Sequence, residues 1–133
     1  MEEENIDRMA LVYFFLRGLH AVKFKNAHDK SFSKKNKKVT QLEQRAWQEM
    51  VRVLNGVTYT RKTTWLMSIV ELALLANVKE DEFLRTLESK ILNGAHFGYL
   101  LDVFAIVEPA TKSEHFSEHF HEAMFDKCLS FID

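Results

Sequence analysis

The sequence predicts an all-α protein: a compact bundle of five or six helices, folded as a single domain over residues 1–133. Nearly half of the residues are apolar, which suffices for a packed core at this length without disulfides. One proline and four glycines are too few for the many turns of a β sandwich or barrel. The third observation is a long apolar run at residues 64–77, which predicts the centre of the bundle.

Residues 64–77 are apolar at almost every position, with Ser68 and Glu71 as the main interruptions. Wound at about 3.6 residues per turn, such a run covers nearly the whole circumference of a helix. The run is shorter than the roughly 20 apolar residues that a membrane-spanning helix needs. We therefore expect a central helix of a soluble domain, with the rest of the chain packed around it.

The first helix begins with acidic residues, which the positive end of a helix dipole favours. Residues 9–16 follow and are apolar on every face of a helix. A second helix of this kind exceeds what one small core can bury, so we expect one face to bind a partner or another copy of the chain. The acidic start also differs from the basic start of a secretory signal peptide.

Residues 26–38 are rich in lysine, and their only large apolar side chain is Phe32. Without apolar periodicity, this stretch predicts a basic flexible loop. Thr40 and Glu43 then have the spacing of a capping box and predict the start of an amphipathic helix. Asn55-Gly56 suits the end of that helix.

Residues 64–91 resemble a helix-turn-helix, with a turn at Asn77-Val78. Three carboxylates at residues 80–82 would head the recognition helix and repel DNA, so we interpret the pair as a helical hairpin. Residues 96–107 fit either a helix or a strand, and a strand would make the domain α-rich and winged-helix-like. We favour a helix, ended by Pro109, because an isolated strand has no partner in this chain.

The last helix is expected to follow a second capping box, Thr111 and Glu114. Large apolar residues near its end, together with those of the first helix, predict a protein-binding interface. The predicted interface residues are Met9, Leu11, Val12, Phe14, Phe15, Phe125 and Leu129. Cys128 is the only cysteine, which excludes an intramolecular disulfide and favours a reducing compartment, the cytoplasm.

Four acid or histidine side chains, His115, His119, Glu122 and Asp126, share one arc if residues 115–126 are helical, and the first three are the candidate metal ligands. Two histidines one turn apart can chelate a transition metal. A single straight helix cannot wrap four donors around one ion, so we expect no structural metal and no cofactor. A metal-dependent enzyme at these histidines is the weakest functional interpretation.

The sequence contains no nucleophile–base pair, glycine-rich phosphate loop or complete metal-ligand set. We therefore expect a non-enzymatic cytoplasmic protein that binds another protein or itself, as an adaptor, an inhibitor or regulator, or a subunit, and that has no membrane partner. The alternative is a nucleic-acid-associated regulator that contacts phosphates through basic side chains. Its predicted contacts are Lys34, Lys35, Lys37, Lys38, Arg45, Arg52, Arg61 and Lys62.

Overall fold

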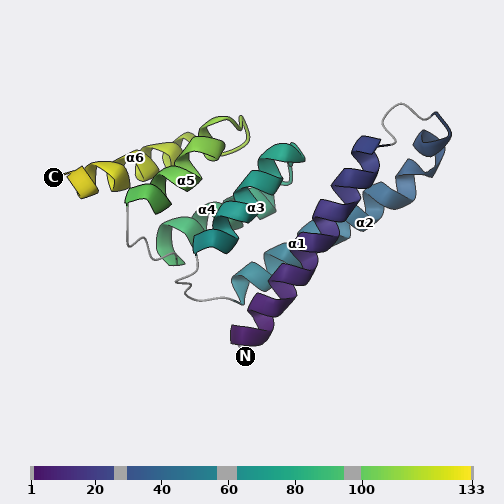
Figure 1. Ribbon diagram of the computed structural model, residues 1–133, viewed down its shortest axis with the longest axis horizontal. Coiled ribbons are helices and arrows are strands. Elements are labelled where there is room, and N and C mark those ends of the chain that lie inside the picture. Colours follow the sequence, from purple (N-terminus) through teal and green to yellow (C-terminus); the bar gives the residue numbers. More distant parts are fainter. Residues whose placement is uncertain (1, 26–29, 57–62, 95–99, 133) are drawn as a thin grey trace. The chain divides into compact units, whose positions relative to one another are not determined.

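The computed structural model describes residues 2–25, 30–56, 63–94 and 100–132, and these residues form six α-helices (Figure 1). The predicted all-α fold with five or six helices is confirmed. No strand occurs in these ranges, and residues 100–107 are helical, so the winged-helix-like alternative is wrong. Residues 96–99 lie outside the described residues.

The chain divides into two compact units, which we call the hairpin unit (residues 1–56) and the four-helix unit (residues 57–133). The hairpin unit consists of α1 (Glu2–Lys25) and α2 (Lys30–Asn55), which run antiparallel side by side (Figure 1). Folding of residues 1–133 as one domain stays a prediction.

The two helices of the hairpin unit bury one face each. The buried apolar side chains are Met9, Val12 and Leu16 on α1, and Ala46, Trp47, Met50, Val51, Val53 and Leu54 on α2. Two ion pairs join the helices at their edges: Lys23 Nζ lies 3.0 Å from Glu43 Oε2, and Arg8 Nε lies 3.5 Å from Glu49 Oε1. Apolar burial therefore holds the hairpin together, and the two ion pairs, which are only partly shielded from solvent, contribute less.

The expected loop at residues 26–38 is wrong from Lys30 onward, because α2 begins there. Lysine is a good helix former, and residues 30–38 contain neither glycine nor proline, so the helix continues upstream of the predicted capping box. Thr40 and Glu43 consequently lie inside α2, where Glu43 pairs with Lys23. The expected stop is confirmed: the Gly56 N–H donates to the carbonyls of Arg52 and Val53, at 3.2 and 3.1 Å. Residues 26–29 lie outside the described residues.

The four-helix unit consists of α3 (Thr63–Leu75), α4 (Asp81–Gly94), α5 (Leu100–Thr111) and α6 (Glu118–Ile132). Helices α3 and α6 each pack against both α4 and α5. The core is built from apolar side chains of all four helices and of the turn before α6. They are Leu66, Ile69, Val70, Leu72, Ala73, Phe83, Leu84, Leu87, Ile91, Val103, Ile106, Val107, Ala110, Phe116, Phe120, Met124 and Cys128.

Helix α3 is the apolar helix predicted at residues 64–77, and five of its side chains belong to this core. Glu71 and Leu75, however, are exposed. The expectation that the helix is enclosed on every side is therefore wrong, since its neighbours α4 and α5 leave part of its circumference uncovered.

Asn77 ends α3 in the left-handed conformation, with a φ of 50°. The Val78 N–H donates to the Ala73 carbonyl at 3.0 Å, and the Asn77 N–H donates to the Leu74 carbonyl at 3.1 Å. These two bonds define a Schellman motif, in which asparagine takes the place usually held by glycine. The turn between α3 and α4 thus follows from a local backbone requirement, in agreement with the predicted helical hairpin.

Two predicted helix boundaries in this unit are wrong. Pro109 lies inside α5, which continues to Thr111, because a proline near the end of a helix removes only one N–H···O=C bond. The box at Thr111 and Glu114 does not begin α6. Ser117 caps that helix instead: its Oγ accepts the Phe120 N–H at 3.1 Å.

Glu88 is the one charged residue buried in the described part of the chain, and it links α4 to the start of α6. Its carboxylate accepts two hydrogen bonds from Arg85 Nη1, at 2.7 and 2.9 Å. It also accepts the Ser117 N–H at 2.7 Å and the Ser117 hydroxyl at 3.1 Å. Arg85 in turn donates to the His115 carbonyl. The buried charge is therefore paired and hydrogen-bonded, as burial of a carboxylate requires.

Replacement of Glu88 by alanine should lower the free energy of unfolding by about 2–4 kcal/mol, because it leaves Arg85 and the Ser117 amide without their buried acceptor. Chemical denaturation monitored by circular dichroism measures this loss. The matched control is Glu82→Ala on the same helix, at an exposed position, which should change stability by less than about 0.5 kcal/mol. Equal effects of the two substitutions would contradict the role assigned to Glu88.

Candidate functional site

The exposed face of α1 carries large apolar side chains. Leu11 is 70% exposed, Phe14 58%, Phe15 48% and Val22 45%. Of the other two interface residues predicted on this helix, Met9 belongs to the buried face and Val12 is almost fully buried beside Leu11. Leu11, Phe14 and Phe15 therefore remain available to a partner.

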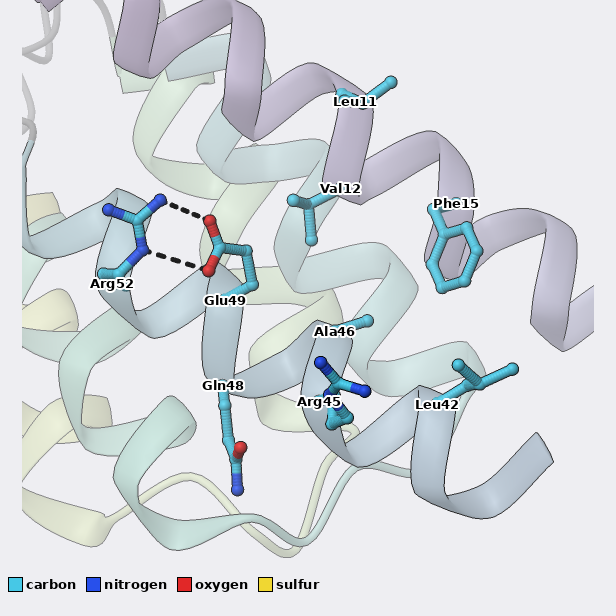
Figure 2. A pocket seen from close by; sticks show the side chains of 9 residues that line it. All are labelled: Leu11, Val12, Phe15, Leu42, Arg45, Ala46, Gln48, Glu49 and Arg52. Atoms are coloured by element: carbon cyan, nitrogen blue, oxygen red, sulfur yellow. Dashed lines mark hydrogen bonds and ion pairs between the residues drawn. The ribbon is translucent and has the colours of Figure 1, made fainter. Parts of the chain in front are cut away.

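A groove of about 780 Å³ opens between α1 and α2 within the hairpin unit. Figure 2 shows Val12 and Phe15 directed from α1 toward α2, where Leu42 and Ala46 face them. The remaining lining residues are Leu11, Arg45, Gln48, Glu49 and Arg52. The groove thus has an apolar floor and a polar rim on the α2 side, which is the usual make-up of a protein-binding surface.

The rim carries an ion pair between Glu49 and Arg52, drawn with dashed lines in Figure 2. Arg52 Nε donates to Glu49 Oε2 at 3.0 Å, and Arg52 Nη2 donates to the other carboxylate oxygen. These hydrogen bonds hold the pKa of Glu49 below its ordinary value of 4.5. Partial burial opposes this shift, and the positive charges of Arg52 and Arg8 add to it. The pair fixes the guanidinium at the edge of the groove.

The predicted phosphate contacts are only partly described. Lys37, Lys38, Arg45 and Arg52 are exposed on α2, although Arg52 is engaged by Glu49. The backbone places Lys34 and Lys35 on the same helix. Arg61 and Lys62 lie outside the described residues.

The predicted interface residues near the end of the chain, Phe125 and Leu129, are exposed on α6, as is Ile132. Their spacing of four and three residues puts them on one side of that helix. They belong to the four-helix unit and form a second apolar surface, separate in the chain from that of α1.

The predicted histidine arc does not form, because α6 begins at Glu118 and leaves His115 in the preceding turn. His115 Nε2 lies 3.0 Å from Asn77 Oδ1, so its ring joins this turn to the end of α3. His119 and Glu122 are exposed on α6. Across the described ranges, no three histidine, cysteine or acidic side chains gather as metal donors.

Cys128 is buried on α6, and burial raises the pKa of its thiol. A raised pKa disfavours the thiolate, so this cysteine behaves as a small core residue and not as a nucleophile.

Sequence reasoning missed the α2 side of the groove. Leu42 and Ala46, one turn apart, belong to the apolar side of the amphipathic helix α2, but Leu42 is partly exposed because α1 covers only part of that side. The sequence feature that could have revealed the groove is the width of the apolar face of α2, because one neighbouring helix cannot cover a face of that width.

Comparison with known proteins identifies no relative: no family model, no curated protein and no solved structure matches the chain. None of the helices in the described ranges has the length and apolar character required to cross a membrane. The functional argument therefore depends on the surfaces described above.

Replacement of Arg52 by glutamine should raise the pKa of Glu49 toward 4.5, because it removes the hydrogen bond that contributes most to the shift. The Glu49 carboxyl ¹³C resonance, followed by NMR against pH, measures this pKa. Arg8→Gln is the matched control and should give a smaller rise, since Arg8 contributes only at longer range. Because the pKa of Glu49 is lowered in the folded state, its carboxylate stabilises the fold at pH values above the ordinary pKa. This stabilisation is lost as the pH falls through the lowered pKa. A larger effect of Arg8→Gln would contradict this assignment.

Proposed function

We propose that this protein is non-enzymatic and acts in the cytoplasm by binding protein through the exposed apolar surface of its hairpin unit. We define this surface, the α1 surface, as Leu11, Phe14, Phe15 and Val22 together with the groove beside them. Roles as an adaptor, a regulator or a subunit of a complex are all compatible with such a surface.

The observation that carries the proposal is the exposure of several large apolar side chains in succession along one helix. Burying one leucine or phenylalanine side chain contributes about 1.5–3 kcal/mol, so this surface offers a partner several such contributions. Scattered single leucines on a protein surface are ordinary, whereas a contiguous row beside a groove is typical of a binding site.

The groove chemistry favours binding over catalysis. Its charged lining residues are Arg45, Glu49 and Arg52, and Glu49 is held as a carboxylate by Arg52. A general base works best with a pKa near the operating pH, and a lowered carboxylate pKa moves away from that range. An amphipathic helix laid in a groove is a common mode of recognition for a surface of this shape.

Substitution of Leu11 and Phe15 together by aspartate should abolish partner capture, because both residues contribute to the α1 surface. The measurement is affinity purification from the native cell after chemical cross-linking, with bound proteins identified by mass spectrometry. Both side chains are exposed, so the variant should keep the parent's helical content by circular dichroism.

The matched control is Arg17→Asp, which introduces the same side chain at an exposed position outside the α1 surface. It should capture the same proteins as the parent. If the parent and the Leu11/Phe15 variant capture the same proteins in equal amounts, the proposed surface is wrong.

A second candidate function, nucleic-acid binding, is favoured by the extension of α2 through the lysine-rich stretch. Lys34, Lys38, Arg45 and Arg52 are spaced by four, seven and seven residues, which places them along one side of a continuous helix. A row of cations of this kind suits a phosphate backbone, and its affinity would be independent of sequence.

For this second candidate, changing Lys34, Lys35, Lys37 and Lys38 together to serine should weaken binding to every nucleic acid alike and flatten its dependence on salt. Fluorescence anisotropy with labelled oligonucleotides at several salt concentrations measures both effects. The control is Lys79→Ser with Lys112→Ser, at exposed positions in the four-helix unit. Failure of the parent to bind at low salt would eliminate this candidate.

A further inference from the structure

We propose that a second copy of this chain covers the α1 surface, with the two α1 helices antiparallel and Phe15 of each copy packed over Gly18 of the other. This inference rests on the proposed function, since it names the partner of the same surface. It follows from the spacing of the apolar residues, from the glycine among them and from the charges at their edge.

The exposed residues Leu11, Phe15, Gly18 and Val22 are separated by four, three and four residues. Separations that alternate between four and three residues keep side chains in one line along a helix. The same spacing is found where two helices pack against each other along their length. In the described part of the hairpin unit, α2 covers the side of α1 that contains Met9 and Leu16, and the line lies next to that side, with Leu11 and Phe15 bordering the groove. The line is thus positioned to receive a third helix.

Gly18 lies in the interior of α1, where glycine lowers helix stability relative to alanine. A Cβ added at Gly18 would meet no heavy atom within 4 Å apart from its chain neighbours and the nearby backbone of α1, so packing within the chain does not require a glycine there. Between Phe15 and Val22, the missing side chain leaves a notch in an otherwise apolar line. A large ring from a facing helix fits such a notch, because glycine lets two helices approach closely.

The antiparallel arrangement that places Phe15 over Gly18 of the second copy also places Leu11 opposite Val22. Asp7 and Lys25, both exposed, are 18 residues apart, which is about five complete helical turns, so they lie on the same flank of the line. In the same register, Asp7 of each copy lies beside Lys25 of the other. A parallel two-fold pair would instead set the two Asp7 residues at one height and the two Lys25 residues at another, on opposite flanks, so that no acid would face a base.

The α1 surface therefore supplies both halves of each contact: ring and notch, acid and base. Self-complementarity of this kind is what a two-fold symmetric interface requires, since the same patch serves both subunits. An unrelated partner would have to provide a separate set of matching groups. For this reason we assign the surface to a second copy.

Sedimentation of the full chain at micromolar concentration should show a dimer. Asp7→Lys alone and Lys25→Asp alone should each weaken dimerisation by about three- to tenfold, because each replaces two attractive contacts with repulsive ones. The double exchange, Asp7→Lys with Lys25→Asp, should restore the affinity of the parent. Gly18→Ala should weaken the dimer about tenfold by filling the notch, although alanine favours the helix itself.

Disulfide trapping tests the register independently. A chain with Asp7→Cys and Lys25→Cys should oxidise to a covalent dimer, whereas Asp7→Cys alone should not, because two Asp7 positions lie about 28 Å apart in the antiparallel register. The native Cys128 is buried and does not compete. Trapping of Asp7→Cys alone as a dimer would overturn the antiparallel register.

A monomer at every concentration would overturn the dimer, and a Gly18→Ala variant that associates as tightly as the parent would overturn the packing of Phe15 over Gly18. The proposed function would survive that result if the parent still captured another protein and the Leu11/Phe15 variant did not. A monomeric parent that captures nothing would refute both proposals.

Discussion

A hairpin of two helices can bury only one face of each, and this limit governs the hairpin unit. Helix α1 has apolar residues on all sides, but α2 is its one neighbour in the unit. Met9, Val12 and Leu16 are buried in this unit, whereas Leu11, Phe14 and Phe15 stay exposed, with Leu11 and Phe15 at the groove beside α2. The exposed surface is thus a consequence of composition and not of a local distortion. An exposed apolar surface of this kind lowers solubility, and association with a partner offsets that cost.

The four-helix unit depends on a different constraint, because it buries the carboxylate of Glu88. Glu88 is stabilised by Arg85 from its own helix and by the amide and hydroxyl of Ser117. The same Ser117 hydroxyl accepts the Phe120 N–H and caps α6. One serine therefore links the start of α6 to the interior of the unit. A network of this kind specifies how the connection between α5 and α6 docks, which apolar contacts alone specify less sharply.

The fold class and most helices could be predicted from the sequence, because they depend on apolar periodicity and on residues with strong local preferences. Asn77, for example, combines a tolerance for positive φ with a position at the end of an apolar run. The failures have a common origin. A capping motif was present at Thr40 and at Thr111, but α2 already begins upstream of the first motif, at Lys30, and α6 begins only after the second, at Glu118.

The candidate site was only partly predictable, since it depends on which side of α1 meets α2. Residues 9–16 carry no polar face from which that side could be chosen. The sequence therefore indicated that α1 exposes apolar surface, but could not separate Phe15 from Met9. The groove beside Leu42 depends on the crossing of two helices, which is a property of tertiary packing.

The two tryptophans of the chain fall in different units: Trp47 is buried in the hairpin unit, and Trp65 is half-buried on α3 of the four-helix unit. Indole fluorescence depends on the surroundings of the ring, so each unit contains its own optical reporter. A chain that keeps only one of the two indoles reports on one unit at a time. The natural placement of these residues thus makes it possible to ask, with ordinary spectroscopy, whether the two units melt together or in sequence.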